Sequence, residues 1–247
     1  MPSRESATTP PSLRERRRAT AVREILDAAE QHLAEHGPQA LSLRAIARSL
    51  GMTVQALYHY FPNRDALLTA LITKAYDDLA DAVQAAVSAG ATSADGSALP
   101  GAVAAAEGYR GWALDHPERF QLLYGTPLRY YEAPLDGPTT RAVRRMGAAF
   151  QRELFGGFTT AQLAAADLPL LSPPFRDHLD QMPPESPDTA VPPAATALYL
   201  SAWGQLHGLV ILEVFGHTGF LGDHRAELFR MTILNLVEDI HRRIPAR

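Results

Sequence analysis

The sequence contains no cysteine, which excludes disulfide bonds and cysteine-ligated metal sites. Motifs typical of common enzymes are also missing: there is no glycine-rich phosphate loop, no G-x-S-x-G turn and no H-E-x-x-H metal motif. The arginines near the N-terminus are not followed by the apolar segment of a signal peptide. These absences favour a cytoplasmic protein that is not an enzyme and that holds no cofactor or metal.

The charge of the chain is unevenly distributed. The net charge of −4 at pH 7 would by itself argue against binding to nucleic acid. Residues 1–76, however, carry ten Lys+Arg and seven Asp+Glu, a net +3, whereas the remainder carries thirteen against twenty, a net −7. A basic first part followed by an acidic second part favours DNA contact that is confined to the first part.

The segment SLRAIARSLGMTVQALYHYF, residues 42–61, predicts two short helices joined by a tight turn. Ser42 and Thr53 stand where a hydroxyl can cap a helix, and Gly51 stands where the turn needs positive φ. Pro62 disfavours helical geometry at Phe61. The apolar positions follow helical spacing in both halves: Leu43, Ile46, Ala47 and Leu50, then Val54, Leu57 and Phe61. This pattern predicts a helix-turn-helix, whose second helix enters the DNA major groove.

The outer face of the second helix carries polar and aromatic side chains instead of the Glu and Lys that are typical of a solvated helix. Thr, Tyr and His side chains reach phosphates, whereas Gln and Ala contact adenine and the thymine methyl group. A helical hairpin with surface aromatics is the alternative, and it accounts for fewer of these features. The predicted phosphate contacts are Ser42, Arg44, Thr53, Tyr58, His59 and Arg64, and the predicted base contacts are Gln55, Ala56 and Tyr60.

The stretch LSLRAIARSLGMTVQALYHYFPNRDALL resembles the DNA-binding domain of TetR-family transcriptional regulators. The resemblance covers about Arg18 to Lys74 and is most specific over Ala56–Phe61 and Asn63–Leu67. It implies an all-α homodimer with an N-terminal three-helix DNA-binding domain and a C-terminal ligand-binding and dimerisation domain. It also implies that the basic residue Arg64 contacts a phosphate.

The predicted domains follow from composition and helical periodicity. We expect a disordered arm at residues 1–15, a DNA-binding domain at 16–76 whose fourth helix continues to about residue 88, and a ligand-binding and dimerisation domain at 100–247. The arginines at 14–18 either touch DNA or begin a solvated helix, and the sequence leaves both open. Prolines between 156 and 193 predict an extended loop with one short helix at about 159–167.

Aromatic residues are concentrated between positions 109 and 131, in a chain that is only 8% aromatic. They form either ordinary core or the wall of an apolar pocket, and the sequence leaves this open. His207, alone in an apolar helix, is more often a hydrogen-bonded core residue than a metal ligand. The predicted ligand-binding residues are Tyr109, Trp112, Phe120, Leu123, Tyr124, Met146, Phe150, Trp203 and His207.

The longest apolar run, residues 194–215, predicts a helix that is buried on several sides. Its length approaches a membrane span, but Ser201, Gln205 and Glu213 within it argue against a membrane location. The helices at 194–215 and 223–244 from each of two chains would form a four-helix dimer interface. Trp203, His207 and Gly208 resemble the signature of a TetR subgroup with a Trp…His-Gly (WHG-type) C-terminal domain, which implies a small-molecule sensor.

These observations predict a ligand-responsive repressor. A homodimer would bind a palindromic operator in double-stranded DNA and would be released by a small, mostly apolar effector. One alternative is an activator of the same architecture, because the position of the operator relative to the promoter decides whether binding represses or activates transcription. An architectural DNA binder without a pocket, and an enzyme that acts on the pocket ligand, are the remaining alternatives.

Overall fold

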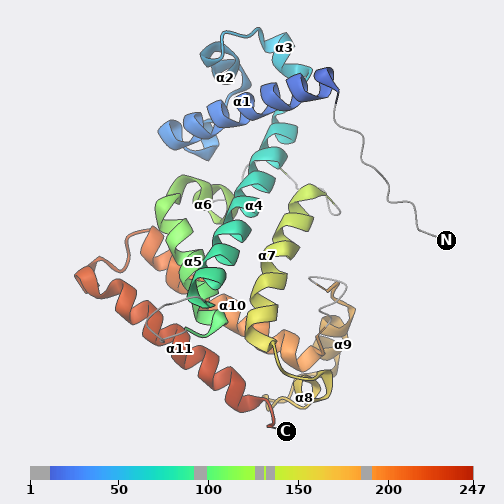
Figure 1. The fold of residues 1–247 in the computed structure, drawn as a ribbon, viewed down its shortest axis with the longest axis vertical. Helices are drawn as coiled ribbons and strands as arrows, with labels where there is room; N and C mark the ends of the chain where they lie inside the picture. Colours follow the sequence, from blue (N-terminus) through green and yellow to red (C-terminus); the bar gives the residue numbers. More distant parts are fainter. Residues whose placement is uncertain (1–11, 92–98, 126–130, 132–136, 185–190, 247) are drawn as a thin grey trace, which may run out of the picture. The chain divides into compact units, whose positions relative to one another are not determined.

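The computed structural model describes residues 12–91, 99–125, 131, 137–184 and 191–246. Every regular element in these ranges is a helix, which confirms the predicted all-α class (Figure 1). The α-helices are α1 (Leu13–His36), α2 (Leu43–Ser49), α3 (Val54–Tyr58), α4 (Arg64–Ala91), α5 (Gly101–Asp115), α6 (Pro117–Tyr124), α7 (Pro138–Phe155), α8 (Thr160–Ala164), α9 (Pro173–Gln181), α10 (Pro193–Val214) and α11 (Arg225–Arg243), with short 3₁₀ turns η1 (Pro38–Ala40) and η3 (Gly219–His224).

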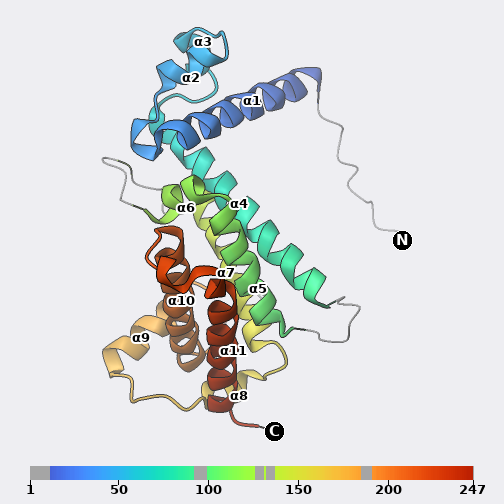
Figure 2. The same ribbon diagram turned by 90° about the vertical axis from the view of Figure 1, so that its left-hand side faces the viewer.

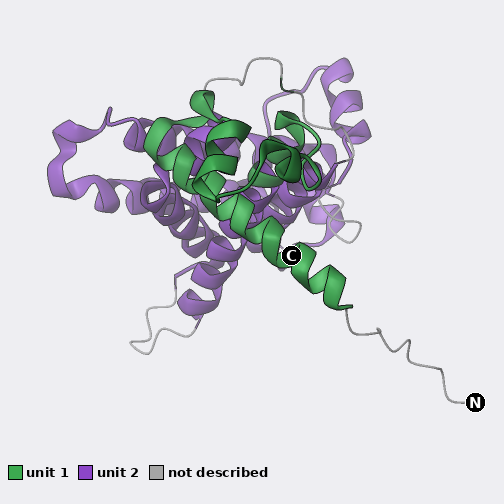
Figure 3. Ribbon diagram, turned by 90° about the horizontal axis from the view of Figure 1, so that it is seen from above, with its two compact units in different colours: residues 1–71, 126–132 green, residues 72–125, 133–247 purple. Residues whose placement is uncertain are grey.

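The chain divides into two compact units, which are coloured separately in Figure 3. Unit 1 comprises the described residues of Met1–Leu71 and Thr126–Glu132, and unit 2 comprises those of Ile72–Gly125 and Ala133–Arg247. Helix α4 therefore contributes residues to both units.

In unit 1, helix α2 packs against both α1 and α3. The side chains of Ile25, Ile46 and Leu57, one from each helix, are at most 1% exposed and form the centre of this small core. Gly51 has a φ of 65°, as the sequence predicts for the residue that ends α2. The packing therefore holds α3 by its apolar side and leaves its polar side outward.

Helix α1 begins earlier than the sequence analysis predicts. Ser12 accepts a hydrogen bond from the backbone N–H of Glu15, while the Glu15 carboxylate accepts one from the backbone N–H of Ser12. This reciprocal capping box satisfies donors that a helix start leaves unpaired, so Leu13 is already helical. The predicted arm is therefore wrong at residues 13–15, and its first eleven residues lie outside the described part of the chain.

Helix α5 is the central helix of unit 2 and packs against α7, α10 and α11, as Figure 2 shows. Tyr109 and Val103 of α5 are completely buried there. Helix α5 also comes close to α4 at Gly108, where an added Cβ would lie 2.7 Å from the Cβ of Ala86 and 3.0 Å from the carbonyl oxygen of Ala82. Only glycine fits between these two helices without a shift of one of them.

The described part of the segment between α7 and α10 contains one more helix than the sequence analysis predicts. Helix α8 (Thr160–Ala164) lies within the predicted short helix, but α9 (Pro173–Gln181) replaces part of the predicted extended loop. Prolines are tolerated in the first turn of a helix because the N–H groups there have no intrahelical partner. Pro173 and Pro174 therefore begin a helix instead of preventing one, and its Leu179 is buried.

Helix α10 is the one helix among the described residues that is long and apolar enough to cross a membrane by length and composition, and 33% of that stretch is buried. An added Cβ at Gly204 or Gly208 would meet no atom within 4 Å. Large apolar side chains are exposed along α10, α11 and their ends: Leu200, Leu212, Phe215, Leu228, Met231 and Leu234. We call these six residues the α10/α11 apolar face.

Candidate DNA-binding surface and ligand cavity

Helix α3 presents a polar outer surface because Leu57 anchors its other side in the core of unit 1. Gln55, Tyr58 and His59 are exposed, and 42% of the Tyr58 side chain is open to solvent. Thr53 and Arg44 are also exposed, whereas Ser42, Ala56 and Tyr60 are half-buried. The structure thus places all of these predicted DNA-binding residues on α2, on α3 or at their ends.

The two predicted capping hydroxyls hold the starts of α2 and α3. Ser42 accepts a hydrogen bond from the N–H of Ala45 at 3.4 Å, and Thr53 accepts one from the N–H of Ala56 at 3.1 Å. A hydroxyl that accepts one bond still has its own proton to donate. Both side chains can therefore cap a helix and donate to a DNA phosphate at the same time.

Arg64 is tied into unit 1 through its backbone. Its Nε donates a hydrogen bond to the carbonyl oxygen of Leu41 at 3.3 Å, and its side chain is half-buried. A guanidinium has five N–H donors, so this bond leaves others for a phosphate. The side-chain oxygen of Asn63, just before α4, accepts a hydrogen bond from the N–H of Ala66 at 2.8 Å.

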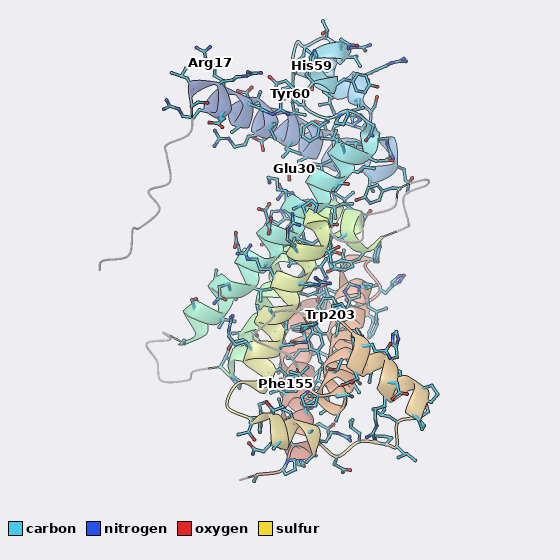
Figure 4. The ribbon with its side chains drawn as sticks, turned by 90° about the vertical axis from the view of Figure 1, so that its right-hand side faces the viewer. Arg17, Glu30, His59, Tyr60, Phe155 and Trp203 are labelled. Carbon is cyan, nitrogen blue, oxygen red and sulfur yellow. The ribbon has the colours of Figure 1, made fainter. Side chains whose placement is uncertain are left out.

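Arg18 of α1 contacts the end of α3, a role that the sequence analysis missed. Its guanidinium carbon lies 5.3 Å from the centre of the Tyr60 ring, and Nη1 and Nη2 lie 3.4 and 3.5 Å from the carbonyl oxygen of His59. His59 and Tyr60 are labelled in Figure 4. No spacing rule relates Arg18 to residues that are more than forty positions away, so only the packing of α1 on the helix-turn-helix reveals the contact.

Unit 2 contains a cavity of about 200 Å³ between α4, α6, α7 and α10. Its lining comprises Tyr76, Tyr124, Val143, Met146, Gly147, Tyr199, Leu200 and Trp203. Three predicted ligand-binding residues, Tyr124, Met146 and Trp203, are among them. The remaining lining residues were not predicted: Tyr76, Val143, Gly147, Tyr199 and Leu200.

The other predicted ligand-binding residues do not line this cavity. Phe150 lines a smaller apolar cavity of about 40 Å³, which also contains Tyr199 and Trp203 in its wall. Tyr109 and Phe120 are completely buried in the core. Trp112 packs against His116, and Leu123 is partly buried against the core.

A polar cluster lies behind the cavity wall. The Tyr109 hydroxyl is 2.7 Å from Nδ1 of His207, and the His207 ring stacks on Trp203 with a centroid distance of 5.3 Å and an interplanar angle of 11°. The Tyr124 hydroxyl is buried near the hydroxyls of Tyr109 and Tyr76, but it has no partner with normal hydrogen-bond geometry. Burial lowers the pKa of His207 and raises the pKa of Tyr109 and of Tyr124, so all three side chains are uncharged near pH 7.

Ion pairs join α4 to two other helices of the cavity wall. Arg145 of α7 pairs with Asp77 at 3.3 Å and also with Asp81, and Arg119 of α6 pairs with Asp78 at 3.0 Å. Asp77 and Asp78 immediately follow Tyr76 in α4, and Asp81 lies one turn further along the helix. The same part of α4 therefore supplies Tyr76 to the cavity wall and carboxylates to ion pairs with α6 and α7.

Two family models match the chain. The model described as bacterial regulatory proteins of the tetR family matches residues 25–71, and the model described as the tetracyclin repressor-like C-terminal domain matches residues 102–236. The second match covers most of unit 2. The narrower resemblance to a Trp…His-Gly subgroup stays a prediction.

Curated relatives and solved structures agree with these matches. HTH-type transcriptional regulators of Mycobacterium tuberculosis H37Rv and Mycobacterium bovis are 37% identical over 195 residues, which cover 79% of this chain and 81% of theirs. The crystal structure of a regulatory protein, SCO4313, is 35% identical with a TM-score of 0.71 and covers 92% of this chain and 100% of its own. A protein from Rhodococcus sp. RHA1, 23% identical over 96% of this chain and 99% of its own with a TM-score of 0.61, shares the fold.

Proposed function

This chain belongs to the TetR family of transcriptional regulators, and from that premise we propose that it is a repressor that binds a palindromic operator as a homodimer and is released by a small ligand. It is a DNA-binding regulator and not an enzyme. The observation that carries the proposal is helix α3, which is anchored by the buried Leu57 and presents Gln55 and Tyr58 to solvent. A cytoplasmic location follows from this role.

Each protomer would insert α3 into a major groove. Ser42, Arg44, Thr53, Tyr58, His59 and Arg64 would hold phosphates, whereas Gln55, Ala56 and Tyr60 would contact bases. Phosphate contacts position the protein, and base contacts determine which sequence it prefers. The two-fold symmetry of the dimer then predicts half-sites whose centres are separated by one helical turn of DNA or a multiple of it.

The α10/α11 apolar face supports the homodimer. Its six large apolar side chains are between 36% and 50% exposed in the single chain. Large apolar side chains that stay exposed on two helices packed against each other are typical of protein interfaces. Gly204 and Gly208 leave room on α10 for the backbone of a partner helix, as their open surroundings indicate.

Helix α4 supports the proposed release by ligand. Its Tyr76 lies in the cavity wall, and its first residues belong to unit 1. A ligand that binds better to one arrangement of α4 than to another would shift the equilibrium by that difference in affinity alone. We expect the favoured arrangement to hold the two α3 helices of the dimer at a spacing that no longer matches the operator.

Selection of bound duplexes from a random DNA library by the purified protein tests this function. One palindromic motif with fixed spacing is the expected result, and binding without any motif that is lost at moderate salt would contradict it. Gln55→Ala should relax preference at one base pair by about 1–3 kcal/mol, whereas Tyr58→Ala should weaken binding to all sequences alike. A reporter gene behind the selected operator then separates repression from activation.

A further inference from the structure

We propose that the 200 Å³ cavity takes an uncharged single-ring ligand that carries one hydroxyl or carbonyl group, and that Tyr199 and Trp203 limit its size. The effect of this ligand on operator binding rests on the proposed function, but binding of the ligand to the protein can be measured without DNA. Three properties of the cavity support the proposal: its volume, its uncharged lining and the buried hydroxyl of Tyr124.

The volume of the cavity fits one ring. An apolar cavity of about 150 Å³ holds a benzene molecule, so about 200 Å³ admits a ring with a small substituent. Tyr199 and Trp203 lie one turn apart on α10 and line both this cavity and the smaller one of about 40 Å³. These two side chains therefore form the partition that prevents a longer ligand from extending into the smaller cavity.

The wall of the cavity requires an uncharged ligand. Tyr, Trp, Val, Met, Leu and Gly residues line it, and none of these types carries a charge near pH 7. Burial keeps His207, whose ring lies 4.4 Å from that of Tyr124, in its neutral form. A charged ligand would lose its hydration without gaining a partner, which costs several kcal/mol.

One group in the wall offers a hydrogen bond. The Tyr124 hydroxyl is buried near the hydroxyls of Tyr109 and Tyr76 without a well-formed hydrogen bond to either, because the Tyr109 hydroxyl is already paired with His207. Buried polar groups in folded proteins are nearly always paired, so an unpaired one requires an explanation. A ligand hydroxyl or carbonyl that reaches Tyr124 would supply the missing bond.

Calorimetric titration of the full-length protein with pairs of probe compounds tests this proposal. We expect phenol to bind about 2- to 10-fold more tightly than toluene, as one hydrogen bond predicts, and benzyl alcohol to bind where benzoate and benzylamine do not. In Tyr124→Phe the preference for phenol over toluene should disappear. In Trp203→Leu, 1-naphthol should bind, although the natural chain excludes it.

Several results would overturn the assignment. Binding of benzoate or benzylamine as tight as that of benzyl alcohol would contradict the uncharged wall, and a full preference for phenol in Tyr124→Phe would contradict the role of Tyr124. Absence of heat with every single-ring probe would remove the site. Release of the operator is measured separately, by fluorescence anisotropy of labelled DNA. Ligand binding without operator release would contradict the proposed repressor mechanism but would still support the proposed ligand class.

A second inference comes from unit 1, where the geometry points to Arg18 as a positioning residue for Tyr60. The guanidinium covers the Tyr60 ring at 5.3 Å and reaches the carbonyl oxygen of His59, the residue that ends α3. A cation near the C-terminal end of a helix interacts favourably with its carbonyl groups. Arg18 would thus fix the end of α3 and the Tyr60 ring in the orientation that reads DNA.

The salt dependence of operator binding distinguishes positioning from a direct phosphate contact. Loss of a phosphate contact reduces the slope of log affinity against log salt by about 1. Loss of positioning leaves the slope unchanged and lowers affinity for the selected operator relative to random DNA. An exposed cation–π contact predicts a loss of about 2- to 5-fold.

Arg18→Gln and the neighbouring Arg17→Gln form a matched pair, because both arginines are exposed on the same helix. We expect Arg18→Gln to lower the operator preference at constant salt slope, with no further loss when it is combined with Tyr60→Leu. Arg17→Gln should leave the preference unchanged. A reduced slope in Arg18→Gln, or full additivity with Tyr60→Leu, would overturn the positioning role.

Discussion

The guanidinium of Arg110 in α5 forms two hydrogen bonds to the carboxylate of Glu213 in α10, with distances of 2.6 and 2.5 Å. Only 6% of the Glu213 side chain is exposed, so this is a buried ion pair. The same guanidinium lies 5.4 Å from the ring centre of Phe229 in α11. One arginine therefore connects three helices of unit 2, two of which carry the proposed dimer interface.

Glu213→Ala should destabilise the protein by about 3–5 kcal/mol, because it leaves the Arg110 charge without its partner in a mostly buried place. The measurement is the free energy of unfolding from urea titration. The control is Arg230→Ala, which removes the exposed pair with Glu107 between α5 and α11. We expect the control to cost at most about 1 kcal/mol, and equal losses in the two variants would contradict the distinction.

Tyr109→Phe should lower the free energy of unfolding by about 1–3 kcal/mol, since it leaves Nδ1 of His207 unpaired. The variant keeps the ring and its edge contacts with Phe150 and Trp203, so packing does not explain the loss. Tyr58→Phe, which removes an exposed hydroxyl, is the matched control and should change stability by less than about 0.5 kcal/mol. A neutral result for Tyr109→Phe would show that the hydrogen bond contributes nothing net.

The stability of the protein should depend on pH through His207. Its folded-state pKa is lowered by burial, whereas an unfolded histidine titrates near about 6.5. As pH falls below the unfolded value, the unfolded chain gains a proton that the folded chain does not, so the free energy of unfolding decreases until the folded pKa is reached. The slope between about pH 5 and 7 should be shallower in His207→Gln than in the natural chain, and equal slopes would exclude this contribution.

Met231→Glu should convert dimers to monomers, because it places a charge within the α10/α11 apolar face, where Met231 is 50% exposed. Light scattering after size-exclusion chromatography measures the mass of each species. Leu13→Glu changes an apolar residue of α1 that is 60% exposed and should leave the mass unchanged. Persistence of dimers in Met231→Glu would place the interface elsewhere.

The sequence was sufficient where local signals decide the structure. Capping residues, the Gly51 turn and helical periodicity predicted α2 and α3. It failed at α9, because prolines were interpreted as breakers although the first turn tolerates them. The Ser12/Glu15 capping box was present in the sequence and was overlooked.

The candidate sites show a different limit. The predicted DNA contacts from Thr53 to His59 lie within one short segment and could be proposed from the pattern of a single helix. The cavity combines Tyr76, Tyr124 and Tyr199 from helices far apart in the sequence, and no periodicity links such positions. The buried partner of a side chain, as in the contacts of Arg18 with Tyr60 and of Tyr109 with His207, depends on tertiary packing and not on local propensity.

The close approach of α5 to α4 at Gly108 leaves no room for a side chain at this position. A methyl group at this position would collide with Ala86 and with the carbonyl oxygen of Ala82, and it would push on the helix whose other end belongs to unit 1. If ligand binding acts by moving α4, as proposed above, Gly108→Ala would displace the same helix without a ligand. Under the proposed release mechanism, a single-codon change outside the cavity lining would then weaken operator binding in the absence of any ligand.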